Sequence, residues 1–153
     1  MKSLKVRSIM THPVVSLERD HSILLAGSLM RLRHIRHLPV ADKGRLVGLV
    51  THRDLLAAQA ALLAAPRGTL TPEEMSVPVS RIMITNVWST SPETSLLDAG
   101  RIMLDHKYGC LPVVEDGKLV GILTEVDLLA LLLDELESRR EREDTDPRLR
   151  IGG

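Results

Sequence analysis

The sequence repeats itself at a fixed offset of 73 positions. Aligned without a gap, residues 6–57 and 79–130 are identical at 22 of 52 positions. The most telling pair is GLVTHRD at 48–54 and GILTEVD at 121–127, which share a glycine, a threonine and an aspartate. A solenoid needs about three or more units to cover its faces. Two copies therefore predict a closed pair of similar units.

Each copy has the same predicted order of elements: an extended segment, a helix, two apolar runs around a polar turn, and a second helix. Ser22 and Ser95 are expected to cap the first helices, and Asp98 follows Ser95 at capping-box spacing. Asp116-Gly117 is a hairpin-turn signal. The predicted fold is α/β in the α+β sense, with two pseudo-symmetric β-α-β-β-α units. A three-stranded sheet cannot cover its apolar face alone, so the units are expected to pack through their sheets.

The copies and the composition between them predict the division of the chain. The first unit is expected at 4–62 and the second at 79–135, joined by a connector at 63–78. Residues 136–153 are expected to form the charged end of the last helix, and a frayed tail beyond Thr145.

Composition excludes several classes of function. Lys plus Arg and Asp plus Glu are balanced at 20 each, so no global field recruits nucleic acid or an anionic membrane. Aromatic residues are 1% of the chain, so the core must be aliphatic. The single cysteine, Cys110, excludes an internal disulfide and fits a reducing compartment. No signal peptide or run near the ~20 apolar residues of a membrane span occurs, so we expect a cytoplasmic protein.

No pattern of catalytic or metal-binding residues stands out. The six histidines lack HExxH spacing, and the nucleophile elbow GxSxG, the P-loop and GxGxxG do not occur. Cys110 begins an apolar strand, where core packing is a simpler role than nucleophilic attack. We therefore expect neither an enzyme nor a metal site.

Over about residues 4–135 the chain resembles a tandem pair of CBS domains, the arrangement known as a Bateman module. The resemblance rests on the IM…V pattern before the first extended segment, A-G…M in the helix, LPV, and G-h-h-T-x-x-D, where h is apolar, each present twice. It implies a regulatory module that binds AMP, ADP, ATP or S-adenosylmethionine in clefts between the repeats, with no cofactor required. It also implies a homodimer, a disc of four repeats.

The T-x-x-D motif has two interpretations, which the sequence leaves open. An ionised carboxylate can accept hydrogen bonds from both ribose hydroxyls, and the resemblance implies this role for Asp54 and Asp127. The same spacing is that of a helix capping box, in which Thr51 and Thr124 exchange hydrogen bonds with these aspartates.

The two copies differ in charge, and this difference predicts two unlike sites. Arg36 and His37 fall where the resemblance places a basic pair that contacts phosphates, whereas repeat 2 has Gly109 and Cys110 there. We therefore expect a phosphorylated ligand at the main site, with adenine against repeat 2. This site comprises Thr51, Asp54, Arg53, Arg36, His37, Thr85, Val87, Tyr108 and Gly109.

The second site is expected to take a less anionic adenosyl ligand or to stay empty, because Glu125 lies beside its phosphate position. It comprises Thr124, Asp127, Ile122, Thr11, Val14 and Ile35. The alternative function is a ligand-free interaction or dimerisation module of the same fold. In either case the output would pass through self-association or an unidentified protein target.

Overall fold

The computed structural model describes residues 4–66, 68, 71 and 76–145. The first repeat contains η1 Val6–Ser8, α1 Ile23–Arg33, β1 His37–Asp42, β2 Arg45–Thr51 and α2 His52–Ala64. The second repeat contains η2 Val79–Arg81, α4 Leu96–His106, β3 Cys110–Glu115, β4 Lys118–Thr124 and α5 Glu125–Thr145. The two repeats therefore share one order of elements, as their sequences predict.

Each repeat is built on an antiparallel hairpin, β1–β2 in the first and β3–β4 in the second. Both tight turns have two residues with positive φ: Lys43 (50°) and Gly44 (82°), then Asp116 (49°) and Gly117 (75°). Such turns match the twist of the strands they join, and glycine adopts this conformation at little cost. The predicted hairpin at Asp116-Gly117 is confirmed.

The third strand expected in each sheet is reduced to a single parallel bridge. Leu17 pairs with Val40, and Thr90 pairs with Val113. The N–H of Leu17 donates to the carbonyl of Pro39 (2.9 Å), so the segment still covers the hairpin edge locally. The chain then turns away toward α1 or α4.

The first helix of each repeat begins at the predicted serine. The hydroxyl of Ser22 accepts from the N–H of Leu25 (3.1 Å), and that of Ser95 accepts from the N–H of Asp98 (3.0 Å). The caps satisfy backbone donors that the first helical turn leaves free. Both capping predictions are confirmed.

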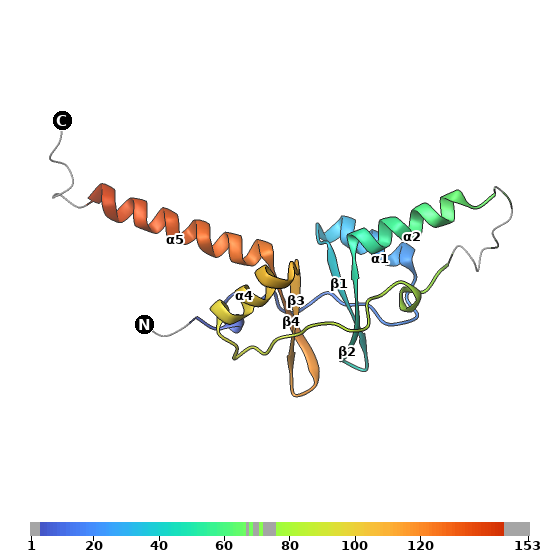
Figure 1. Ribbon diagram of the computed structural model, residues 1–153, viewed down its shortest axis with the longest axis horizontal. Helices are drawn as coiled ribbons and strands as arrows, with labels where there is room; N and C mark the ends of the chain where they lie inside the picture. The colour runs from blue at the N-terminus through green and yellow to red at the C-terminus, as the bar shows by residue number, and fades with distance from the viewer. Residues whose placement is uncertain (1–3, 67, 69–70, 72–75, 146–153) are drawn as a thin grey trace.

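The N-terminal segments of the repeats are exchanged, which the repeat alignment does not reveal. The N–H of Val6 donates to Thr94 of the second repeat (3.0 Å), and the N–H of Val79 donates to His21 of the first (2.8 Å). Val6 is fully buried in the core of repeat 2, and Val79 in that of repeat 1. Figure 1 shows the N-terminal segment starting beside α4 and crossing to the side of α1. Each repeat thus completes the core of the other.

The seam between the repeats has a small apolar core of its own. Leu49, Cys110 and Ile122 are buried there, with Val14 and Val87 packed against them. Because these side chains come from both hairpins and both preceding segments, the seam fixes the two repeats against each other. Packing through the sheets is confirmed.

Gly48 and Gly121 let the exchanged segments approach the hairpins. Ile84 exchanges two backbone hydrogen bonds of 2.9 Å with Leu49, next to Gly48. A Cβ on Gly48 would lie 3.1 Å from the carbonyl oxygen of Ile84, and one on Gly121 would lie 3.0 Å from that of Thr11. The side chains of Met83 and Met10 lie closer still to these Cβ positions. The glycine of the repeated motif therefore leaves room for both the backbone and a methionine of the exchanged segment.

The helices lie on the outer sides of the hairpins, with α1 and α2 together at one end of the molecule and α4 at the other (Figure 1). The helix α5 runs away from the body, and its charged half from Asp134 to Glu143 is exposed. The tail expected at 146–153 and residues 67, 69–70 and 72–75 of the connector lie outside the described residues. Within the described part of the chain, no helix is both long enough and apolar enough to cross a bilayer.

Candidate functional site

The first T-x-x-D motif forms a complete capping box at the start of α2. The Oδ2 atom of Asp54 accepts from the N–H of Thr51 (3.0 Å) and from its hydroxyl (2.7 Å). The hydroxyl of Thr51 in turn accepts from the N–H of Asp54 (3.2 Å). These bonds hold the carboxylate at the N-terminus of the helix.

The second motif has the same geometry at the start of α5. Oδ2 of Asp127 accepts from the N–H (2.7 Å) and the hydroxyl (2.9 Å) of Thr124. Within the described residues, Oδ1 of Asp54 and Oδ1 of Asp127 accept no hydrogen bond. The capping interpretation is therefore confirmed for both motifs, and each carboxylate retains one oxygen that can bind a ligand.

The first motif opens onto a cavity of about 680 Å³ between the repeats, which we call the Asp54 cavity. It contains six of the nine residues predicted for the main site: Thr51, Asp54, Arg53, Arg36, His37 and Gly109. The rest of its lining is His52, Leu56, Ile84, Lys107 and Glu125.

Three residues predicted for the adenine wall of the main site lie outside the Asp54 cavity lining. Val87 packs into the apolar core of the seam. Tyr108 stacks on His106 with ring centroids 5.3 Å apart, and Trp88 lies beside both rings. Thr85 is exposed.

The second motif opens onto a cavity of about 580 Å³, which we call the Asp127 cavity. All six residues predicted for the second site line it: Thr124, Asp127, Ile122, Thr11, Val14 and Ile35. They come from both repeats, since Thr11 reaches β4 through the exchanged N-terminal segment. The remaining lining residues are Val15, His34, Arg36, His37, Gly109, Glu125 and Val126.

The charges of the two cavities differ in the predicted direction. Three cations, Arg36, Arg53 and Lys107, face two carboxylates, Asp54 and Glu125, in the Asp54 cavity. Among its described lining residues, the Asp127 cavity has Arg36 alone against the two carboxylates of Glu125 and Asp127. The first cavity is therefore the better environment for an anion.

The sequence analysis did not name Lys107 and Ile84 for the main site, and it placed Glu125 beside one site only. The offset of 73 pairs Thr11 with Ile84, so applying it to the second site would have named Ile84 instead of Thr85. It likewise pairs His34 with Lys107; both end a first helix in the left-handed region, at φ 53° and 58°. Glu125 was expected beside the second site only, but it lines both cavities.

His37 lies in the wall shared by the cavities, and its environment favours the neutral imidazole. Burial lowers its pKa below the ordinary 6.5; the Glu125 carboxylate raises it and the Arg36 guanidinium lowers it. Neutral His37 can donate or accept one hydrogen bond, but contributes no full charge to phosphate binding near pH 7.

Cys110 is buried at the seam rather than presented to either cavity. Burial, and then the negative charge of Glu125, raise the pKa of its thiol to about 12. A thiol of this kind is protonated at neutral pH and is a poor nucleophile. The structure therefore supports the packing role expected from the sequence.

A third cavity, of about 690 Å³, is a groove between α1 and α2. We call it the helix groove. Arg31 and Arg36 line it, and no carboxylate is found among the lining residues that the structure describes. Its apolar side is formed by Leu24, Met30, Ile35 and Leu55.

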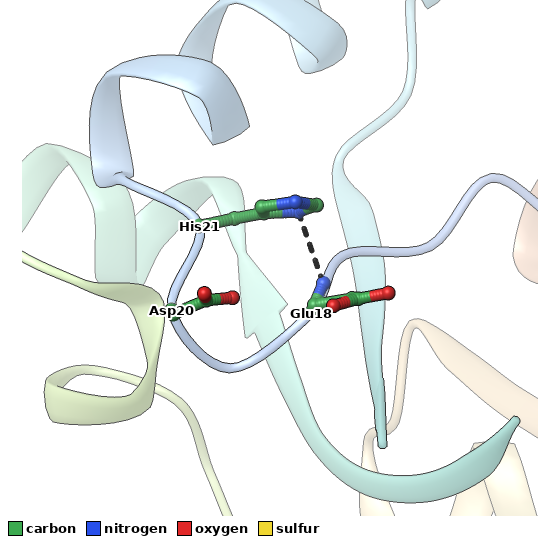
Figure 2. Close-up of side chains that lie close together, drawn as sticks. All are labelled: Glu18, Asp20 and His21. Carbon is green, nitrogen blue, oxygen red and sulfur yellow. Dashed lines mark hydrogen bonds between the residues drawn. The ribbon is translucent and has the colours of Figure 1, made fainter. Parts of the chain in front are cut away.

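The loop before α1 brings Glu18, Asp20 and His21 together, with one potential ligand atom of each within 4.8 Å of the others. Figure 2 shows the His21 ring directed at the backbone of Glu18, whose N–H donates to Nδ1 (3.0 Å). The carbonyl of His21 also accepts from Val79 of the exchanged segment. These contacts explain the cluster: the His21 side chain closes the loop, and η2 packs against that loop.

A family model of the CBS domain matches the chain twice, at residues 6–61 and 79–134. The chain belongs to the CBS domain family. The CBS domain-containing protein YhcV of Bacillus subtilis is 34% identical over 123 residues, covering 80% of this chain and 81% of YhcV. The next three relatives are longer proteins, of which this CBS pair spans 15 to 33%.

Solved CBS structures share the fold. CBSX2, solved in complex with AMP, has a TM-score of 0.71 and 31% identity, covering 85% of this chain and 96% of its own. The CBS domain pair of MJ0100, solved with 5'-methylthioadenosine and S-adenosyl-L-methionine, has a TM-score of 0.73 and 25% identity. It covers 87% of this chain and 98% of its own. The resemblance to a tandem CBS pair is therefore confirmed.

Proposed function

We propose that this CBS pair is a non-catalytic sensor that binds adenosyl ligands in the Asp54 and Asp127 cavities. The observation that carries the proposal is the composition of each cavity. A T-x-x-D carboxylate with one free oxygen comes from one repeat, and the facing wall includes residues of the other. A ligand in either cavity would therefore touch both repeats and report on their packing. The AMP and S-adenosylmethionine complexes of CBSX2 and MJ0100 support this ligand class.

The Asp54 cavity is proposed to take a phosphorylated ligand such as AMP, ADP or ATP. The free carboxylate oxygen of Asp54 would accept from ribose, and Arg36, Arg53 and Lys107 would face the phosphate. Arginine can bind phosphate through two parallel hydrogen bonds. The Asp127 cavity, with one cation against two carboxylates, suits an adenosyl ligand without phosphate.

Ligand occupancy is proposed to reach a second copy of the chain. Leucines at 129, 132, 133 and 136 of α5 are at least half exposed, and the same helix carries Asp134, Glu135 and Glu137. Arg31 lines the helix groove, and no carboxylate is among its described lining residues, so its charge is opposite to that of Asp134 and Glu137 on α5. Glu135 pairs with Arg139 of its own helix. We therefore propose a homodimer in which α5 of one copy lies in the helix groove of the other, giving a disc of four repeats. Unpaired and buried Cys110 fits the cytoplasmic location expected for such a protein.

Thermal melting with separate additions of AMP, ATP and S-adenosylmethionine tests the ligand class. A ligand at 100 times its dissociation constant adds about 2.7 kcal/mol of stability, which is several degrees in the midpoint of a chain this size. Mass spectrometry of small molecules retained during purification would name the ligand. If no adenosyl compound raises the melting temperature, the ligand proposal is wrong.

The second candidate function is a ligand-free interaction module. It is favoured by the capping boxes, which already give both motif carboxylates a structural role, and by the exposed leucines of α5. It predicts a stable dimer whose melting temperature no nucleotide changes.

A further inference from the structure

The two cavities are separated by one shared wall. Arg36, His37, Gly109 and Glu125 line both of them. Glu125 donates its N–H to the carbonyl of Gly109 (3.1 Å), which fixes its backbone at this wall. A ligand in either cavity therefore contacts groups that a ligand in the other cavity also uses.

Within the shared wall, Arg36 is the group free to change partners. Its carbonyl accepts from the N–H of His52 (2.8 Å), so its backbone is anchored. Its side chain is exposed and, among the described residues, forms no ion pair. Arg36 also lines the helix groove, and no ion pair among the described residues holds its guanidinium toward one cavity.

The charge balance decides what such a turn would do. Among the described residues that line the Asp127 cavity, Arg36 is the only arginine or lysine, and Glu125 and Asp127 line the same cavity. The Asp54 cavity has Arg53 and Lys107 in addition. When Arg36 moves to a phosphate in the Asp54 cavity, two carboxylates in the Asp127 cavity lose their counter-charge.

We propose that Arg36 couples the two cavities, so that an anionic nucleotide in the Asp54 cavity favours a cationic adenosyl ligand in the Asp127 cavity. Two anionic ligands disfavour each other for the same reason. Linkage requires the effect to be reciprocal, so a cation in the Asp127 cavity also tightens the anion. This inference rests on the proposed function and assigns the ligand charges of its two sites.

A matched pair of ligands isolates the charge. S-adenosylmethionine and S-adenosylhomocysteine are nearly the same shape, but the sulfonium of the first adds one positive charge. Calorimetric titration measures the affinity of each, with and without saturating AMP. AMP is expected to improve the affinity ratio of the sulfonium compound over its neutral partner by about fivefold at low salt, the lower end of couplings between sites.

A matched pair of variants isolates Arg36. Arg36 lines both cavities, whereas Arg53 lines the Asp54 cavity only. In Arg36→Gln the effect of AMP on the ratio is expected to fall to about twofold or less, since only the field of the bound phosphate remains. In Arg53→Gln, AMP binds more weakly, but at saturation it still shifts the ratio about fivefold.

Each result supports or overturns a distinct statement. If both ligand types bind and AMP leaves the ratio unchanged, or if Arg53→Gln removes the shift as fully as Arg36→Gln, the coupling is wrong while the proposed function stands. If AMP and S-adenosylmethionine displace each other from one cavity, the two-site coupling is also overturned. If neither ligand binds the wild-type chain alone, the proposed function fails, and the coupling with it.

Discussion

His37 of the first repeat lies directly against Gly109 of the second. A Cβ on Gly109 would come within 2.8 Å of Nε2 of His37. Gly109→Ala is therefore expected to push the imidazole aside and distort the wall that both cavities share. Because the ring can rotate away, we expect a loss of stability below about 1.5 kcal/mol, with a larger proportional loss of ligand affinity. Chemical denaturation and calorimetry measure the two effects, and unchanged affinity for AMP and S-adenosylmethionine would contradict this.

The glycines of the repeated motif permit the exchange of segments. Gly48→Ala or Gly121→Ala would place a Cβ against the carbonyl of Ile84 or Thr11, and is expected to cost about 1–3 kcal/mol. Gly100→Ala, in helix α4, is the matched control, because a Cβ there would lie 3.9 Å from its nearest neighbour, Cδ1 of Leu128 in α5. That substitution is expected to be neutral or to stabilise by about 0.5–1 kcal/mol. Equal urea midpoints for all three variants would refute the packing argument.

The capping role of the motif aspartates can be separated from a ligand role. Asp54→Ala removes the acceptor for the N–H of Thr51 and is expected to cost about 1 kcal/mol without any ligand. Asp54→Asn keeps an acceptor oxygen and should cost less. For AMP affinity, Asp54→Ala is expected to be more damaging than Asp127→Ala, since the Asp54 cavity holds the additional cations. The reverse order in calorimetric titration would move the phosphate site to the Asp127 cavity.

The lowered pKa of His37 predicts a pH dependence of stability. Because burial lowers its folded pKa below 6.5, the unfolded chain binds the proton more tightly. The contribution of His37 therefore decreases as pH falls from 6.5 toward the folded pKa. In His37→Gln this decrease should be absent, so its free energy of unfolding should change less between pH 7.5 and 5.5 than that of wild type. Parallel curves for the two proteins would show that His37 does not titrate in this way.

The proposed dimer predicts that Leu133 of α5 is needed for self-association. Leu133→Glu adds a charge to the half-exposed apolar side of α5 and is expected to give monomers in sedimentation, with the circular dichroism of the fold unchanged. Arg140→Glu, on the exposed charged end of the same helix, is the control and should leave the assembly intact.

A pair of cysteine variants tests how α5 of one copy lies in the helix groove of the other. Leu24→Cys and Leu132→Cys should cross-link when mixed and not when each is alone.

The sequence was most informative where local chemistry decides the conformation. Serine caps, the Asp116-Gly117 turn and the T-x-x-D boxes depend on residues within three or four positions, so they could be predicted. All six residues named for the second site line the Asp127 cavity, but Arg36, His37 and Gly109, which also line it, were assigned to the main site alone. For the main site, Thr85, Val87 and Tyr108 were named, whereas Ile84 and Lys107 line the cavity. The offset of 73 pairs Ile84 with Thr11 and Lys107 with His34, so the repeat held this signal, and the adenine wall was placed one residue away from it.

The duplicated sequence by itself determined that two like units would pair and that their motifs would begin helices. It also determined that only one unit would carry the basic pair Arg36 and His37. The tertiary structure decided that Val6 and Val79 each complete the core of the opposite repeat, and that Glu125 lies in a wall common to two cavities. Helix capping and tight turns depend on interactions between residues that are close in sequence. The exchange of N-terminal segments and the wall shared by the two cavities bring together residues that are distant in sequence. Their positions are fixed only by the packing of the whole chain.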